Sequence, residues 1–454
     1  MNNIMKIIVV GAGKVGYSVA QRLVQDEHDV YIIEKSAERI RKIENSLDVS
    51  LVQGNGSSLK LLKQIGMDDV GMLIAVTDSD EVNMLACSVA KIGGIPKTIA
   101  RVRDNEYLQD DNRKLQEQLG VDLFINPELV TAQELVQVLQ TPAALDVEDF
   151  ASGAVRLMEF KMSEDIPYVN KRLRDIRFPA SVLVVGILRN GEMIIPHGES
   201  RLMPYDKVFI LGAKDSMEQI ALEFHEENLS LDTKRVVLVG AGLIGCNLAV
   251  LLERAGFIVK IIEKDLKRCE YLATLVNDSM VINGDGTNME LLEAEEISDS
   301  DAIICLTDDD KLNLLVALLA KHLGVPKTIV RVGRPEYIVL MEQVGIDIVF
   351  SPRLLTSGEI LRMVRKGEHV MSISTFEGSK AEAVEVELTE VSPLVNCALK
   401  DLKLPGKALV GAIVRNGSTI VPTGNTVLEA KDHIVFFTLP DHVNKLLTYL
   451  QPPV

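Results

Sequence analysis

The stretch that decides the fold is KIIVVGAGKVG, from Lys6 to Gly16. It begins as a short apolar run typical of a buried strand, and its three glycines precede an amphipathic, helix-forming segment. Those glycines are Gly11, Gly13 and Gly16. In this context they allow a tight turn and bring backbone N–H groups and the positive end of a helix close to a pyrophosphate. A GxGxxG pattern alone is weak evidence for nucleotide binding, so the interpretation depends on the strand before the glycines and the helix after them.

The same stretch occurs twice. RVVLVGAGLIG begins at Arg235 and carries Gly240, Gly242 and Gly245. VYIIEK, ending at Lys35, recurs as VKIIEK, ending at Lys264, and GIPKTIARV recurs as GVPKTIVRV. The copies lie about 225 to 230 residues apart and together span nearly the whole chain. The chain is therefore a tandem duplication.

Each copy begins with a large module in which short apolar runs alternate with helical-period segments. In the first copy the expected strands are Ile7 to Val10, Val30 to Ile33, Ser50 to Val52, Leu73 to Val76, Thr98 to Arg101 and Leu123 to Ile125. Near-continuous apolar strands separated by helices predict a parallel sheet covered on both faces. We therefore expect two doubly wound, Rossmann-like α/β domains.

Each copy ends with a smaller module of different pattern. RLMEFKM, SVLVVGILRNGEMIIP and DKVFILG alternate apolar and polar residues, which indicates a small α+β domain. Asn-Gly pairs predict hairpin turns at Asn190-Gly191 and Asn416-Gly417. The expected domains are 1–126 and 232–352 (dinucleotide-binding) and 143–228 and 368–453 (small).

An acidic residue ends the second strand of each large module, as Glu34 and Glu263. At that place a carboxylate accepts hydrogen bonds from ribose hydroxyls and repels a 2′-phosphate. The sequence therefore favours NAD(H) or an adenine nucleotide, ATP or ADP, over NADP. The alternative is that the glycines only make tight turns.

Further polar residues follow the later strands of each copy. Asn55 and Asp285 lie between glycines, where a short polar side chain could meet adenine. Arg101 and Arg331 end the fifth strands and could reach phosphates, although an ordinary ion pair is the alternative.

Thr-Asp pairs follow the fourth strands, as Thr77-Asp78 and Thr307-Asp308. The carboxyl ends of parallel strands converge on one crevice, so these pairs are expected beside the glycine loops. Helix capping is the competing interpretation, since Thr and Asp also cap helices well.

Composition excludes several classes of protein. The chain has 454 residues with a formal charge of −17, which disfavours binding to nucleic acid or to bare anionic lipid. No apolar run approaches the roughly 20 residues of a membrane span, and no signal peptide is expected. The five cysteines are scattered without a CxxC pair, so we expect reduced core residues in the cytoplasm.

The sequence shows no catalytic apparatus. The seven histidines, His28, His197 and His433 among them, show no HxxxH spacing and no partner across the two copies, so neither a catalytic base nor a metal site is expected. An NAD-dependent dehydrogenase, the main alternative, needs a substrate domain that supplies a base. A redox-sensing transcription factor would need a basic recognition helix.

The chain carries an ordered set of motifs that occurs twice: GAGKVG, Glu34, GNG, Thr-Asp with Asn83, then Pro96 and Arg101, followed by a small module. This ordered, repeated set resembles the RCK (KTN plus TrkA-C) family of Trk potassium uptake. The resemblance implies a non-enzymatic cytoplasmic regulator, peripheral on the inner face of the cell membrane. Such a subunit forms a ring beneath a membrane potassium transporter subunit of the TrkH type and is moved by bound NAD(H), ATP or ADP. The ligand-binding residues would be Gly11, Ala12, Gly13, Lys14, Val15, Gly16, Glu34, Asn55, Thr77, Asp78 and Arg101, then Gly240, Ala241, Gly242, Leu243, Ile244, Gly245, Glu263, Asp285, Thr307, Asp308 and Arg331.

One difference separates the two expected sites. Lys14 in the first glycine loop is matched by Leu243 in the second. An ammonium group at a helix N-terminus favours a ligand with more phosphate charge. The first site is therefore expected to prefer ATP or ADP over NAD more than the second, unless Lys14 simply points into water.

Overall fold

The computed structural model describes residues 4–108, 113–141, 143–224, 234–365, 370–376, 381–404 and 407–450. Five of the expected domain limits, 1, 228, 232, 368 and 453, lie outside these residues. Part of the extra segment that follows Tyr107 in the first copy also lies outside them. The chain forms two compact units. The first runs to Thr131 and includes Pro352–Val364, and the second comprises the remainder.

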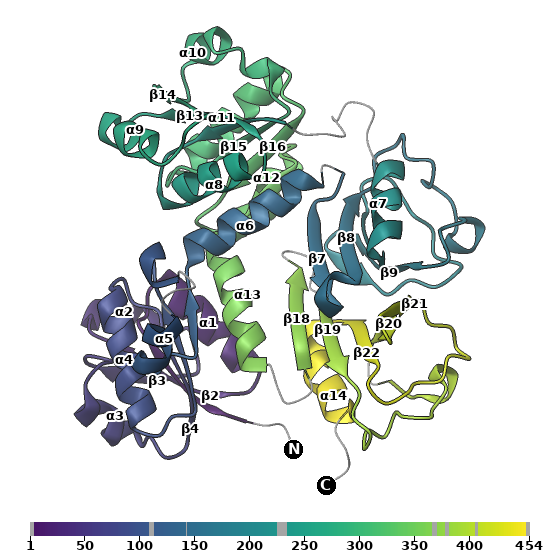
Figure 1. Ribbon diagram of the computed structural model, residues 1–454, viewed down its shortest axis with the longest axis horizontal. Coiled ribbons are helices and arrows are strands. Elements are labelled where there is room, and N and C mark those ends of the chain that lie inside the picture. Colours follow the sequence, from purple (N-terminus) through teal and green to yellow (C-terminus); the bar gives the residue numbers. More distant parts are fainter. Residues whose placement is uncertain are drawn as a thin grey trace. The chain divides into compact units, whose positions relative to one another are not determined.

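The first unit contains a six-stranded parallel sheet in the order β3-β2-β1-β4-β5-β6 (Figure 1). Its strands are β1 Lys6–Val10, β2 Asp29–Glu34, β3 Ser50–Gln53, β4 Val70–Ala75, β5 Lys97–Arg101 and β6 Leu123–Ile125. The intervening helices are α1 Lys14–Gln25, α2 Ala37–Ile43, α3 Leu59–Ile65, α4 Asp80–Ile92 and α5 Arg113–Leu119. The strand order reverses between β1 and β4, and ligands of doubly wound sheets bind at that crevice.

The second unit contains the same sheet again, in the order β14-β13-β12-β15-β16-β17. Its strands are β12 Arg235–Val239, β13 Ile258–Glu263, β14 Met280–Asn283, β15 Ala302–Cys305, β16 Lys327–Arg331 and β17 Ile348–Phe350. Its helices are α8 Leu243–Arg254, α9 Leu266–Ala273, α10 Met289–Ala294, α11 Asp310–His322 and α12 Ile338–Gln343. The predicted pair of doubly wound domains is confirmed.

Alternate residues of the central strand enter different cores. Ile7 and Val9 pack into one hydrophobic cluster, and Ile8 and Val10 pack into another on the opposite face of the sheet. All four side chains are almost fully buried. A strand covered on both faces must be apolar at every position, which explains the uninterrupted run in the sequence.

Each small domain is built on a five-stranded antiparallel sheet. The first has the order β10-β9-β11-β8-β7 and contains β7 Asp146–Phe150, β8 Val155–Lys161, β9 Val182–Arg189, β10 Glu192–Ile194, β11 Lys207–Ala213 and α7 Lys214–Glu223. The second has the order β18-β19-β22-β20-β21 and contains β18 Val370–Phe376, β19 Ala381–Glu387, β20 Leu409–Arg415, β21 Ser418–Ile420, β22 His433–Thr438 and α14 Pro440–Leu450. The edge strands β7 and β18 were not expected from the sequence.

The Asn-Gly hairpins form as predicted. Asn190 and Gly191 have φ values of 52° and 78°, and Asn416 and Gly417 have 50° and 77°. Two successive positive φ values characterise a type I′ turn, whose twist suits a two-residue hairpin.

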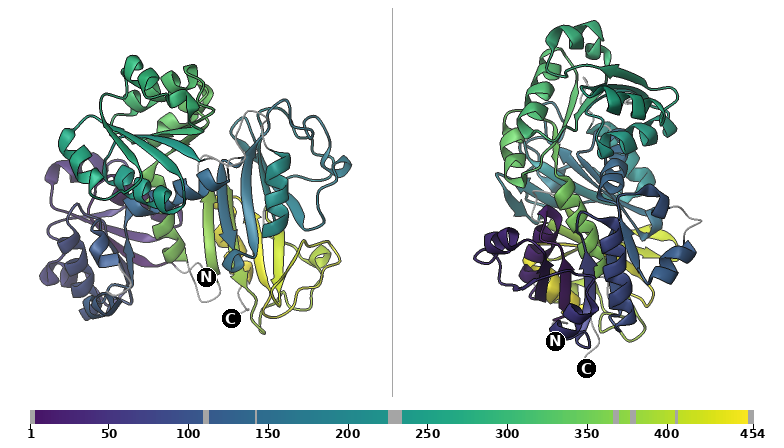
Figure 2. Two further views of the ribbon diagram at one scale, coloured as in Figure 1. Left: turned by 45° about the horizontal axis from the view of Figure 1, so that its top comes forward. Right: turned by 90° about the vertical axis from the view of Figure 1, so that its left-hand side faces the viewer.

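The two small sheets share a core within the second unit. Phe209 of β11 and Phe437 of β22 have ring centroids 5.8 Å apart. A Cβ atom added to Gly186 would lie 2.7 Å from the Phe437 ring, so glycine permits this approach. Figure 2 shows the two small domains, coloured blue-teal and yellow, side by side. The small domains are therefore joined by apolar packing.

A long helix connects each Rossmann-like domain to the small domain after it. These helices are α6 Pro127–Gln140 and α13 Pro352–Arg365. Although α13 directly follows the second Rossmann-like sheet in the chain, its Ile360, Leu361 and Val364 are buried in the core of the first, on the cluster that contains α1 (Figure 1). Arg353 at its start lies over the Tyr17 ring of α1, 5.5 Å from the centroid. The first domain is therefore completed by a distant segment of the chain.

Among the residues that the structure describes, no helix is both long enough and apolar enough to span a membrane.

The shared core yields a testable expectation for Ile360. Ile360→Ala should lower the free energy of unfolding of the first unit by about 2–4 kcal/mol, because it leaves a cavity in a filled core. Hydrogen exchange of the β1 and α1 amides measures this effect. Leu340→Ala in α12, where the side chain is 56% exposed, is the matched control and should leave those amides unchanged. Unaltered protection of β1 in Ile360→Ala would contradict the shared core.

Candidate functional site

The glycines of the two loops have separate roles. Gly11 and Gly240 have φ values of +100° and +109°, which favour glycine. A Cβ atom on Gly16 would lie 1.9 Å from the carbonyl oxygen of Gly11, so the third glycine is needed for the turn to close. Gly13 and its counterpart Gly242 instead face open space, with no atom within 4 Å of an added Cβ. The middle glycine therefore leaves room for a ligand to approach the backbone.

A buried carboxylate holds each glycine loop. Glu34, the last residue of β2, accepts hydrogen bonds from the Ala12 N–H and the Ser36 N–H, both at 2.8 Å. Glu263 accepts from the Ala241 N–H at 2.6 Å and from the Asp265 N–H at 2.8 Å. Since a carboxylate oxygen has two lone pairs, each can also accept from a ribose hydroxyl. Both predicted carboxylates thus lie against their glycine loops.

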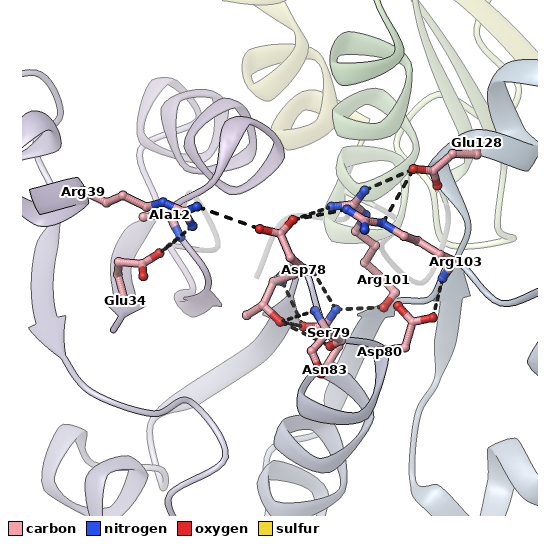
Figure 3. Close-up of polar contacts among 11 residues, drawn as sticks. Ala12, Glu34, Arg39, Asp78, Ser79, Asp80, Asn83, Arg101, Arg103 and Glu128 are labelled. Atoms are coloured by element: carbon pink, nitrogen blue, oxygen red, sulfur yellow. Dashed lines mark hydrogen bonds and ion pairs between the residues drawn. The ribbon is translucent and has the colours of Figure 1, made fainter. Parts of the chain in front are cut away.

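The threonines after β4 and β15 are held by buried asparagines. Asn83 of α4 accepts hydrogen bonds from the backbone N–H and the hydroxyl of Thr77, at 2.9 and 2.7 Å. Its amide donates to the carbonyls of Thr77 and Arg101, at 3.1 and 2.9 Å (Figure 3). Asn313 makes the same four contacts with Thr307 and Arg331 in the second copy. The asparagine therefore fixes the ends of two neighbouring strands at the crevice.

Capping does not explain the Thr-Asp pairs. The N-cap of α4 is Ser79, whose hydroxyl accepts from the Val82 N–H, and the N-cap of α11 is Asp309. The cap is thus one residue beyond each pair, and the capping interpretation is wrong. The aspartates are left to interact with arginines.

Three arginines surround Asp78 in the first site (Figure 3). Nitrogen atoms of Arg39, Arg101 and Arg103 lie 3.9, 3.7 and 3.2 Å from its carboxylate oxygens. Glu128 of α6 also contacts Arg101 at 3.2 Å and Arg103 at 3.8 Å. Because the Asp78 side chain is 68% exposed, it occupies an accessible place that suits an anion. Arg101 thus makes the ion pair that is the alternative to phosphate contact, and its contact with phosphate stays a prediction.

Sequence reasoning did not name Arg39 and Arg103 or assign Glu128 to the site. A signal existed for Arg39, which follows Glu34 by five residues and is matched by Arg268 after Glu263. Arg103 is matched by Gly333, so no repeat marks it.

The second site is simpler. Arg331 donates to the carbonyl of Thr307 and to the carboxylate of Asp308, both at 2.7 Å. The Gly333 N–H donates to Asp310 at 2.7 Å, as the Arg103 N–H does to Asp80 at 2.8 Å. The backbone arrangement is therefore retained although the third arginine is absent.

Asn55 and Asp285 form turns within their own loops. Asn55 accepts from the Ser57 hydroxyl at 3.0 Å. Asp285 accepts from the Thr287 hydroxyl at 2.7 Å and pairs with Lys264 at 2.9 Å. Three hydrogen bonds lower the pKa of Asp285 to about 2. The largest effect comes from the Thr287 N–H, and smaller effects come from Lys264 and from the Thr287 hydroxyl. Asp285 is thus negatively charged at physiological pH.

The two crevices differ in charge at matched positions, and the differences run in both directions. Five pairs are more negative in the second crevice: Lys14 and Leu243, Ser36 and Asp265, Asn55 and Asp285, Ser79 and Asp309, and Arg103 and Gly333. Other pairs in the same segments are more positive there, among them Glu81 and Lys311, and Asp104 and Arg334. Glu128 offsets one of these charges in the first site. Lys14 is exposed and Leu243 is 54% exposed, so this pair lies at the open edge of each glycine loop.

Not every predicted residue directs its side chain to the crevice. Val15 packs against the hydrophobic cluster of α1, and Ile244 is buried. These two residues can serve a ligand through their backbone N–H groups at the helix N-terminus.

Two buried cysteines contact the backbone of the second crevice. The Cys246 thiol donates to the Ala241 carbonyl at 3.5 Å, and the Cys269 thiol donates to the Glu263 carbonyl at 3.4 Å. Cys87, Cys246, Cys269 and Cys305 are buried thiols, and burial raises the pKa of each. Within the described ranges, no three His, Cys, Asp or Glu side chains are grouped so that they could hold a metal ion.

The domain pattern matches two known families in alternation. Residues 7–127 and 236–352 match the TrkA-N domain, and residues 157–225 and 383–451 match the TrkA-C domain.

Solved structures share the fold. The chain is similar to the GsuK channel bound to NAD, with a TM-score of 0.64 and 16% identity over 98% of this chain and 79% of that chain. It is also similar to the GsuK RCK domain, with a TM-score of 0.63 and 17% identity over 98% of this chain and 95% of that chain.

Full-length relatives are closer in sequence. The Trk system potassium uptake protein TrkA homolog 1 of Methanosarcina mazei is 36% identical over 98% of this chain and 100% of its own length. The Trk system potassium uptake protein TrkA of Halomonas elongata is 35% identical over 96% of both chains. With both domain types present twice in the same order, the chain belongs to the TrkA family of Trk system potassium uptake proteins.

Proposed function

We propose that this chain is the cytoplasmic, nucleotide-sensing regulatory subunit of a Trk-type potassium uptake system. Each Rossmann-like domain binds NAD(H), ATP or ADP in the crevice between its glycine loop and its Thr-Asp segment. Ligands that differ in affinity for two arrangements of the subunit shift the population between them. That shift opens or closes a membrane potassium transporter subunit of the TrkH type, beneath which several copies form a ring.

One observation carries this proposal: each copy has a glycine loop with an open middle glycine and a buried carboxylate bound to the same loop. Gly13 with Glu34 and Gly242 with Glu263 make two equivalent crevices. Two similar ligand sites on a duplicated frame suit a sensor, because both can act on one conformational equilibrium.

The choice of ligand draws on the neighbours of the same fold. One solved GsuK structure is described as bound to NAD and another as bound to ADP. The buried carboxylate at the end of the second strand favours these ligands over NADP.

Regulation without catalysis is the other part of the proposal. A dehydrogenase would need a proton-transfer group beside the nicotinamide. Among the polar groups at the first crevice, Glu34, Asp78 and the arginines are engaged with one another or with the backbone. They supply binding and charge and suit a ligand that is held without reaction.

Nucleotide binding is tested one site at a time. Glu34→Ala and Glu263→Ala should each weaken binding at one site by roughly 10- to 100-fold, because a charged acceptor for the ribose is lost. Isothermal calorimetry with NADH and with ATP measures the effect. Unchanged isotherms for both variants would refute the dinucleotide interpretation.

Two further variants separate ligand contact from folding. Gly13→Val should abolish binding at the first site while the fold is retained, since its Cβ would enter open space. Glu38→Ala is the matched control, because Glu38 lies in the adjoining helix and pairs only at the surface with Lys42. Full binding by Gly13→Val would show that the ligand does not approach this loop.

The charge difference predicts different ligand preferences. Lys14→Leu should lower the ATP-to-NAD affinity ratio at the first site, and Leu243→Lys should raise it at the second, each by about 1 kcal/mol for a partly exposed charge. Each measurement is made with the other site disabled by Gly13→Val or Gly242→Val. Ratios that stay constant would mean that Lys14 acts only as a solvated surface residue.

Membrane association is expected to require a protein partner. With a formal charge of −17, the subunit should remain in the soluble fraction with protein-free anionic liposomes. It should float with liposomes that contain a TrkH-type potassium transporter subunit. Strong salt-sensitive flotation with lipid alone would contradict the proposed mode of attachment.

A further inference from the structure

Glu128 divides one oxygen atom between two arginines of the first crevice (Figure 3). Its Oε1 lies 3.2 Å from Arg101 Nη2 and 3.8 Å from Arg103 Nε. Among the described residues, Glu128 Oε2, Arg101 Nε and Arg103 Nε are buried atoms that make no hydrogen bond. Buried polar atoms normally have a hydrogen-bond partner. The contact of Glu128 with the arginines therefore leaves both an acceptor and two donors unused.

Arginines that hold the frame pair differently in the same chain. Arg189 contacts both carboxylate oxygens of Asp206 at 2.8 Å, and Arg415 contacts both carboxylate oxygens of Asp432 at 2.8 Å. Both aspartate side chains are almost fully buried. A pair that uses both oxygens is the strong geometry for arginine and carboxylate. The contacts of Glu128 are weaker by this comparison, and another anion can replace them.

The duplication changes both ends of this contact together. Arg103 is matched by Gly333, and Glu128 is matched by Arg353. Arg353 instead lies over the Tyr17 ring. The asparagine contacts that fix the strand ends are nevertheless the same in both copies. The frame therefore does not need the contact between Arg103 and Glu128, which serves something particular to the first crevice.

The arginines lie within reach of the first glycine loop. Gly11 packs against Thr77, since an added Cβ atom would lie 3.1 Å from the Thr77 Cα, and Asp78 is the next residue. Arg39 spans from Glu34, at 3.7 Å, to Asp78, at 3.9 Å. The Glu34 carboxylate, the glycine loop and the arginine group thus border one crevice, and all of them belong to the first unit.

We propose that Glu128 is an internal competitor for ligand phosphate and thereby limits the preference of the first crevice for ligands with free phosphate groups. This inference rests on the proposed binding of nucleotides. Phosphate oxygens take Arg101 and Arg103 from Glu128 and from the exposed Asp78, and they accept hydrogen bonds from the guanidinium donors that Glu128 leaves unused.

The position of Glu128 keeps it in competition after the ligand has bound. Glu128 lies in the first turn of α6, and its side chain is 15% exposed. Its negative charge therefore stays beside the bound phosphate and opposes it. A ligand that carries no phosphate meets no such opposition, so the effect of Glu128 depends on the phosphate charge of the ligand.

Isothermal calorimetry on the full chain tests the proposal, with the second site disabled by Gly242→Val and with ATP and adenosine as probes. Glu128→Gln removes the competing charge and keeps the side-chain shape. It should strengthen ATP binding by roughly 3- to 10-fold and leave adenosine binding unchanged. A merely structural role would instead change the affinity for both ligands alike. Arg101→Gln should weaken ATP binding and remove most of the gain in the double variant with Glu128→Gln.

Two further variants and two distinct failures complete the test. Glu117→Gln removes the same charge at an exposed position of α5 and should leave ATP binding unchanged. Arg103→Gly takes the residue of the second copy and should weaken the binding of ATP but not that of adenosine. Unchanged ATP affinity in Glu128→Gln would overturn the proposal and leave nucleotide binding standing. If the unmodified first site does not bind ATP, both this proposal and the proposed function are overturned for that site.

Discussion

The rest of the crevice depends on one hydrogen bond, between the carboxylate that ends the second strand and the backbone of the glycine loop. Glu34 binds the Ala12 N–H and Glu263 binds the Ala241 N–H. This contact needs a parallel pair of strands in register, a positive φ at the first glycine and a third glycine without a side chain. A buried carboxylate is stable only when its oxygens are satisfied, so the loop and the strand hold each other in place. In the proposed nucleotide complex, the ribose would meet an acceptor that is already positioned.

Much of the fold could be predicted because the sequence repeats its own pattern. The central strands are apolar at every residue, and the Asn-Gly turns require positive φ, so both have strong local signals. The edge strand β7 has no such signal, because DVEDF reads as a charged loop. Its acidic residues are stabilised by partners elsewhere in the chain: Asp149 pairs with Arg156 across the sheet at 2.6 Å. A cross-strand pair becomes visible only once the strands are placed together.

The site was predictable for the residues that touch the backbone and less so for those that touch each other. Glu34 and the glycines follow from the chemistry of a strand, a turn and a helix. The arginine group around Asp78 draws on the segment after β2, on β5 and on the loop beyond it, so no spacing in the sequence reveals it. The same holds for α13. Its burial in the core of the first domain depends on long-range packing that periodicity does not encode.

Duplication allows one copy to act as a reference for the other. Residues that hold the frame are retained in both, as Asn83 and Asn313 show with identical contacts. Other matched positions differ in charge: Arg103 is matched by Gly333 at the crevice, and Lys207 by His433 in the small domain. At the crevice the backbone contact is the same, since the Gly333 N–H donates to Asp310 as the Arg103 N–H does to Asp80. In the small domain the His433 side chain lies against the buried Glu385, as Lys207 lies against Glu159. A frame fixed by backbone and apolar contacts thus leaves charge free to diverge, and two sites of one shape can respond to different signals.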